Sequence, residues 1–272
     1  MPAVKLSFAE VLSEGYGTFF RNLSLFFHLV TIPWILSLGI RIGGAFLAED
    51  SLPAVLVEKL LELVPSVMFM VGWQRAMLLG PARVGSPPGL AWSARETAYL
   101  VHLVKIAGVT FVLVAAFVLT VGSLDPSRLG QAAPLDPELA RAQTLAAPLS
   151  LGLIVSTLLA LRVSFGLAAT AVDLPFSPRL SWAYSRGNAV TIVAALFLSY
   201  FLGTLATALT MLVVYGVLRS VLGSGDGVAV VSWAAAILVS YGGAGLVATV
   251  QAVIFRRLLG WREGRPLPPP GS

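Results

Sequence analysis

Arginines within apolar stretches are the residues of this chain best placed to do chemistry. Arg162 lies near the middle of one apolar run, and Arg75 lies shortly before Gly80 at the end of another. A guanidinium facing lipid costs roughly 3 kcal/mol or more, so Arg162 must face protein, water or a bound anion. Two interpretations stay open: Arg162 bonds neighbouring helices as a packing device, or it lines a cavity for an anionic group. Asp173 shares its helical face but lies about three turns away, beyond direct contact.

A polar stripe opens the third apolar run. Arg95, Tyr99, His102 and Lys105 recur at spacings of three or four, which places them on one helical face. This stripe faces water or anionic headgroups, which attract cations beside a membrane. Alternatively, His102 and Lys105 line a cavity open to the cytoplasm together with Arg75 and Arg162. Both interpretations make these residues candidates for ligand or partner binding.

Catalytic and metal-binding patterns are missing from the sequence. The chain has no cysteine, which excludes thiolate chemistry, and its two histidines, His28 and His102, belong to different apolar runs. No HExxH or GxSxG pattern occurs, and Asp173 is the one aspartate close to the inner end of a run. We therefore expect no metal, no cofactor and no enzymatic activity.

Composition sets the class of protein. The 272 residues are 57% hydrophobic and 11% charged, with a mean hydropathy of +0.87, whereas soluble domains carry about a quarter charged residues. Spanning helices need about 20 apolar residues. The sequence therefore predicts one integral membrane domain over residues 1–265, an all-α polytopic bundle, followed by a proline-rich disordered tail over residues 266–272. The predicted spans are residues 23–48, 60–79, 99–121, 149–172, 189–217 and 228–254.

The distribution of positive charge predicts the orientation. Most of the 18 Lys and Arg residues fall on the side of the N-terminus, which places both termini in the cytoplasm under the positive-inside rule. The expected location is the bacterial cytoplasmic (inner) membrane. These cations are spread over every inner connection, which argues against nucleic-acid binding and favours contact with anionic headgroups.

The inner connections are built alike. An amphipathic interfacial helix is expected over residues 1–22, and capping-box patterns occur at Ser7–Glu10 and Ser93–Glu96. Ser177 and Pro178 supply an N-cap followed by proline before the fifth span. These features suggest an interfacial helix and a hairpin used three times.

Small residues at a spacing of four predict close helix packing, within the chain or between copies in a homo-oligomer. They are Gly39, Gly43, Ala236, Ser240, Ala244, Ala248 and Ala252.

Several segments resemble a loose group of bacterial six-helix membrane proteins, similar to the membrane domain associated with some glycerophosphodiester phosphodiesterases. The segments are Trp73 to Gly80, Ala94 to Tyr99, Arg162-Val-Ser-Phe, Ala171 to Pro175, and Ser181 to Asn188. The resemblance implies six helices with recurrent interfacial helices. It draws attention to Arg75, Arg162, Arg186 and Asn188 and brings no catalytic residues, because the hydrolase would be a separate soluble domain.

The sequence thus favours a non-enzymatic module that binds a partner, either anionic lipid or another membrane protein. A transporter or lipid-handling protein with a cytoplasm-facing cavity around Arg162 is the second hypothesis. An intramembrane enzyme is the third. A cavity that exposes Arg162 would support the second hypothesis, and an Arg162 bonded by protein groups would support the first.

Overall fold

The computed structural model describes residues 5–47, 52–84, 92–122, 152–175, 177–223 and 225–263, and every regular element within these ranges is helical. The predicted tail over residues 266–272 and the first residues of the predicted fourth span lie outside them. The elements are α1 (Phe8–Arg21), α2 (Leu23–Leu47), α3 (Leu52–Leu79), η1 (Pro81–Arg83), α4 (Ala94–Gly122), a helix at Gly152–Ser164, α6 (Leu167–Ala171), α7 (Pro178–Tyr184), α8 (Ala189–Leu222) and α9 (Asp226–Leu259).

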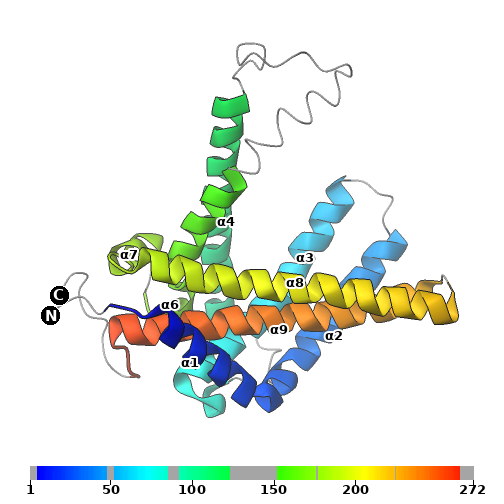
Figure 1. Ribbon diagram of the computed structural model, residues 1–272, viewed down its shortest axis with the longest axis horizontal. Helices are drawn as coiled ribbons and strands as arrows, with labels where there is room; N and C mark the ends of the chain where they lie inside the picture. The colour runs from blue at the N-terminus through cyan, green and yellow to red at the C-terminus, as the bar shows by residue number, and fades with distance from the viewer. Residues whose placement is uncertain are drawn as a thin grey trace.

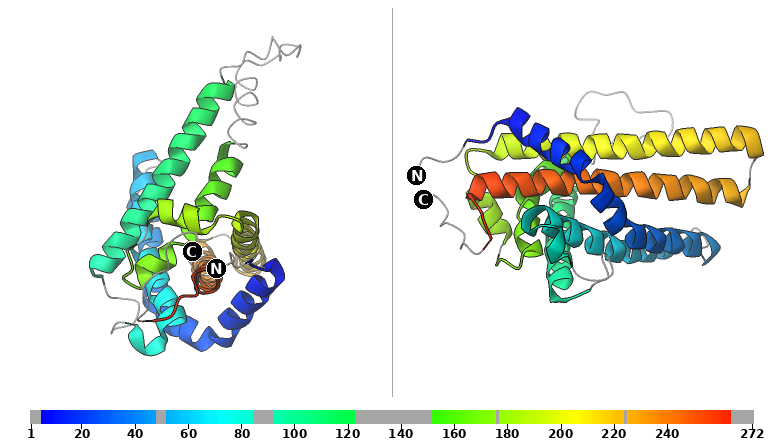
Figure 2. Two further views of the ribbon diagram at one scale, coloured as in Figure 1. Left: turned by 90° about the vertical axis from the view of Figure 1, so that its left-hand side faces the viewer. Right: turned by 90° about the horizontal axis from the view of Figure 1, so that it is seen from below.

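Three pairs of helices fan out from one end of the molecule, which we call the base (Figure 1). The pairs are α2 with α3, α4 with the helix Gly152–Ser164, and α8 with α9. The far ends of the pairs, the tips, point in three different directions, whereas α1, α6 and α7 gather at the base (Figures 1 and 2). The short helices thus lie where the three pairs converge.

Four helices of the described chain are long and apolar enough to cross a membrane. They are found at Leu23–Ala45, Ala94–Ala116, Ala189–Leu222 and Asp226–Leu259. The helix Gly152–Ser164 is apolar but falls short of the roughly 20 residues that a span needs. Helices of this length and apolarity make the chain a membrane protein.

An aromatic cluster holds the base together. Trp73 of α3 is fully buried, stacks on Phe69 with ring centroids 6.1 Å apart and meets Phe19 of α1 and Phe26 of α2 edge to face. Its indole Nε1 donates to Thr249 Oγ1 of α9 at 2.8 Å, so the polar atom of the ring is satisfied inside the core. One side chain thus joins four helices.

Helices α8 and α9 lie side by side (Figure 2), and they approach closely at two glycines that are not among the predicted small packing residues. A Cβ on Gly203 would lie 2.8 Å from the Cα of Gly243, and the reverse distance is the same. By contrast, no described atom outside its own helix lies within 4 Å of a Cβ placed on Gly39 or Gly43. The packing predicted for that pair is not formed within the described chain.

The alanine stripe of α9 divides between two environments. Ala248 and Ala252 are buried at the base, as expected for a packing face. Ser240 and Ala244, nearer the middle of the helix, instead line a half-open cavity, and Ala236 is only partly buried. Spacing alone did not distinguish the two halves.

The predicted span over residues 149–172 is interrupted in its described part. The helix ends at Ser164, the chain turns at Phe165 and Gly166, and the five-residue α6 follows. The carbonyl of Val163 accepts from Gly166 N at 3.3 Å and from Ser181 Oγ at 2.8 Å, contacts that replace the bond a continued helix would make. Arg162 therefore lies near the end of a helix rather than at mid-span.

Helix α1 lies across α9 as an amphipathic segment, with Val11 fully buried. The capping box expected at Ser7 is absent, because the Ser7 side chain makes no cap bond. Glu10 instead pairs with Arg257 at 2.6 Å. Charge pairing to α9 therefore replaces a local cap.

Candidate functional site

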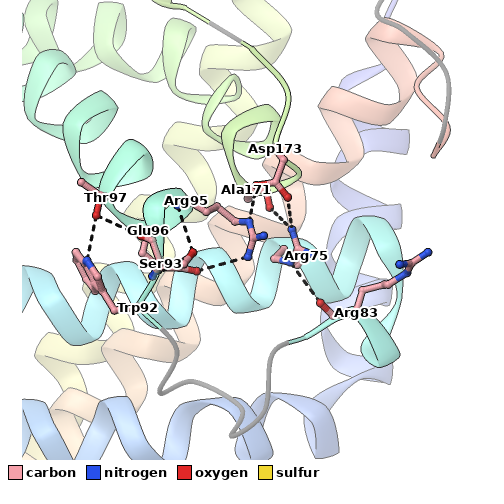
Figure 3. Close-up of polar contacts among 9 residues, drawn as sticks. All are labelled: Arg75, Arg83, Trp92, Ser93, Arg95, Glu96, Thr97, Ala171 and Asp173. Atoms are coloured by element: carbon pink, nitrogen blue, oxygen red, sulfur yellow. Dashed lines mark hydrogen bonds and ion pairs between the residues drawn. The ribbon is translucent and has the colours of Figure 1, made fainter.

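Asp173 joins three parts of the base (Figure 3). Its Oδ2 accepts from Arg75 Nη1 of α3 at 3.1 Å, and its Oδ1 accepts from Arg95 Nε of α4 at 2.7 Å. Arg75 also donates to the carbonyls of Ala171 at 3.0 Å and Arg83 at 3.3 Å. Arg75 therefore crosslinks three segments of the chain and does not extend freely to the surface.

The backbone of Asp173 sits at φ 62°, in the left-handed region that few residues other than glycine adopt. Aspartate is among the side chains that tolerate it, and here its carboxylate is held by two guanidinium groups. Partial burial would raise the pKa of this carboxyl, but the hydrogen bonds and charges of Arg95 and Arg75 outweigh it and lower the pKa below its usual value. Such a carboxylate is a weak proton acceptor, which makes it a poor general base.

The capping box at the start of α4 forms as predicted. Ser93 N donates to Glu96 Oε2 at 2.7 Å, Ser93 Oγ contacts the same oxygen, and Arg95 N donates to Ser93 Oγ at 3.2 Å. The buried Glu96 thereby fixes the first turn of α4. This cap aims Arg95 at Asp173 (Figure 3).

Arg162 is bonded by protein groups. Its guanidinium lies 3.4 Å from the centroid of the Trp182 ring, and its Nε donates to Ser185 Oγ at 2.9 Å. Trp182 belongs to α7, and this residue is 41% exposed. The arginine thus covers an exposed indole at the edge of the base, where the ring gains a cation–π contact.

Positive charge around α7 is not neutralised. Within the described ranges, no carboxylate lies in ion-pair distance of Arg162, Arg179 or Arg186, and Arg186 lies close enough to Arg162 to repel it. Arg179 and Arg186 are exposed. We call these three arginines and Trp182 the α7 surface.

Two polar residues of the Ser181–Asn188 segment serve the fold. Asn188 is buried, and its Oδ1 accepts from the backbone N of Leu6 at 2.8 Å, which ties the start of the chain to the beginning of α8. Ser181 is buried and bonds the carbonyl of Val163. Asn188, which was predicted as a candidate ligand residue, therefore has a structural role.

The cavity predicted from Arg75, Arg162, His102 and Lys105 is not assembled. His102 Nδ1 hydrogen-bonds Thr170 Oγ1 at 2.9 Å and borders a space of only about 10 Å³, which suits one water. Lys105 is exposed. Arg75 and Arg162 belong to the two separate clusters described above.

A buried amide network was missed by sequence reasoning. Gln74 Nε2 of α3 donates to Gln251 Oε1 of α9 at 2.8 Å, and Gln251 Nε2 donates to Ser164 Oγ at 3.1 Å. Both glutamines are almost fully buried. An amide in an apolar helix needs a hydrogen-bonding partner, so the two glutamines within apolar runs could have been predicted to pair with polar groups.

The fold and these clusters define an α-helical membrane protein with a partly unneutralised cationic surface at its base. No family model, no curated protein and no solved structure matches the chain.

Proposed function

We propose that the chain is a non-enzymatic membrane module whose base faces the cytoplasm and binds the phosphate-bearing headgroups of anionic lipids through the α7 surface. The observation that carries the proposal is the Arg162 guanidinium stacked on the exposed Trp182 ring without a carboxylate partner. Tryptophan favours the headgroup layer, and arginine presents several donors to phosphate oxygens.

Other arginines at the base are paired with carboxylates, unlike those of the α7 surface. Arg256 and Arg257 pair with Glu14 and Glu10, and Arg75 and Arg95 share Asp173. Those arginines are neutralised within the chain, so they attract an anionic membrane surface less. The α7 surface keeps its charge free for a ligand from outside the chain.

The proposal includes the topology expected from the sequence. Six spans arise if α3 and the helix Gly152–Ser164 cross the membrane together with the four long helices. The three helix pairs, with α1 and α7 lying at their base, fit an interfacial helix and a hairpin used repeatedly. Both termini would then lie in the cytoplasm of a bacterium, at its inner membrane. The resemblance to the membrane domain of glycerophosphodiester phosphodiesterases is consistent with this arrangement.

Lipid binding can be tested by native mass spectrometry of the purified protein with added phosphatidylglycerol or phosphatidylcholine. We expect preferential retention of phosphatidylglycerol. Arg186→Gln should weaken that retention by about fivefold, since one basic residue near an anionic surface contributes about 1 kcal/mol. Arg162→Gln should do the same or more, since it also removes the stacked guanidinium.

Arg219→Gln is the matched control. Arg219 lies in the last turn of α8, at the tips, with its guanidinium 6.0 Å from the Tyr215 ring. The Arg219→Gln substitution therefore removes the same charge beside an aromatic ring, but at the end of the molecule opposite the α7 surface. Equal weakening by Arg219→Gln, or equal retention of both lipids by the unsubstituted protein, would contradict the proposal.

A further inference from the structure

A half-open cavity of about 140 Å³ lies between α2, α3 and α9. Its lining residues Ser37, Glu62 and Tyr241 lie near the middle of their helices, far along the chain from the α7 surface. The volume is many times the roughly 10–15 Å³ that one water needs. A small organic molecule fits it.

Part of the cavity lining is polar and presents oxygen atoms. The hydroxyls of Ser37 and Tyr241 lie 2.8 Å apart and bond each other, and Ser66 and Ser240 add two further hydroxyls. Glu62 supplies the single charged group among the lining residues. Ionisable groups within apolar helices commonly mark ligand or ion sites.

The rest of the lining is apolar. It consists of the fully buried Phe69 together with Met70, Ile237 and Ala244. The rings of Phe69 and Tyr241 meet edge to face, with their centroids 5.2 Å apart. A bare metal ion gains nothing from these apolar side chains, whereas a short alkyl chain would be covered by them.

Glu62 already accepts an ammonium group. Lys59 Nζ lies 2.7 Å from Glu62 Oε2 and also 3.5 Å from Glu58 Oε1, so one exposed lysine is shared between two carboxylates. Because Lys59 is 54% exposed and has a second partner, a ligand ammonium can take its place at Glu62.

We propose that this cavity binds a small organic ammonium ion, with its cationic head on Glu62 and the hydroxyls and its alkyl part against Phe69 and Met70. The site is independent of the headgroup binding proposed above, because the two share no residue.

The test uses butylammonium as the probe on the full chain in detergent, with butanol and butyrate as neutral and anionic analogues of the same length. Tryptophan fluorescence follows the thermal unfolding midpoint, and the readout is the shift that each probe causes. We expect a saturable upward shift with butylammonium and none with butanol or butyrate, because ligands that bind the folded state raise its stability.

Glu62→Gln should weaken butylammonium binding by about tenfold or more, since it removes the charge that pairs with the ligand. Glu58→Gln is the matched control, because Glu58 lies on the same helix, also contacts Lys59 and does not line the cavity. Ala244→Leu keeps the charge but fills the apolar part, and it should also abolish the shift.

Four results would overturn the proposal. The first three are an equal shift in Glu62→Gln or Ala244→Leu, an equal shift with butanol, and a shift produced by sodium chloride but not by butylammonium. The fourth is loss of the shift in Glu58→Gln as well as in Glu62→Gln, which would assign the effect to Lys59 rather than to the cavity.

Discussion

Asp173 shows how single residues act at the base. It is 56% exposed, yet it holds Arg75, which is only 13% exposed, and Arg95 from another helix. A carboxylate bonded in the folded state has a lower pKa there than in the unfolded chain. Its stabilising effect is therefore present at neutral pH and is lost as the pH falls below the ordinary value of about 4 towards the lowered pKa.

Asp173→Asn tests this at the residue scale. Asparagine tolerates the left-handed backbone, so the substitution removes the charge without adding strain. At neutral pH we expect the free energy of unfolding to fall by about 1 kcal/mol, a small value because Asp173 is more than half exposed. In strong acid the variant and the unsubstituted protein should be equally stable. Denaturant titrations in detergent at both pH values measure it.

The control for Asp173 is Glu263→Gln. Glu263 pairs with Arg83 at 3.0 Å, but both side chains are more than half exposed, so its removal should change stability little. A similar loss in both variants, or a loss in Asp173→Asn that persists in acid, would show that the ion pair is not the cause.

At the scale of elements, the same capping pattern led to two results. Ser93 and Glu96 form the predicted box, whereas Ser7 and Glu10 do not. Glu10 lies within reach of Arg257 on α9, and that pairing takes the carboxylate away from the helix start. A local pattern therefore predicts a cap only where no tertiary partner competes.

Gly203 and Gly243 determine how closely α8 and α9 approach. Gly243→Ala should lower the free energy of unfolding by about 1–3 kcal/mol, because the added methyl group meets backbone that can move only with its helix. Titration of the protein from mild detergent into sodium dodecyl sulfate measures this free energy.

Gly216→Ala on α8 is the companion variant. No described atom outside the helix lies within 4 Å of its Cβ, so it should be neutral or stabilising by up to about 1 kcal/mol. Equal effects at positions 216 and 243 would mean that helix propensity, and not the close approach, controls the difference.

At the scale of the whole molecule, the start of α1 and the end of α9 lie at the base, and the turn between α8 and α9 lies at the tips (Figure 1). The chain has no cysteine, so single cysteines can be introduced without background. In intact cells an impermeant maleimide should label Gly227→Cys at the tips and leave Lys5→Cys and Glu263→Cys unlabelled. All three should react after permeabilisation. Labelling of Lys5→Cys in intact cells would reverse the proposed orientation.

The sequence by itself determined the class of protein and most helix positions. Composition and the length of apolar runs suffice for that, because a bilayer demands long apolar helices whatever their neighbours are. The Ser93–Glu96 cap and the Ser177 N-cap were also predictable, since their bonds join residues three apart. The first interpretation of Arg162, a packing contact with a neighbouring helix, likewise came from the sequence.

Only the tertiary structure decided where polar side chains find their partners. Arg162 was expected at mid-span, but the break after Ser164 places it on Trp182, which is 20 residues away in the chain. Helical spacing related Asp173 only to Arg162, whereas its partners Arg75 and Arg95 lie 98 and 78 residues away in the chain. Helical periodicity fixes the face of a residue, and only packing between helices fixes what that face meets.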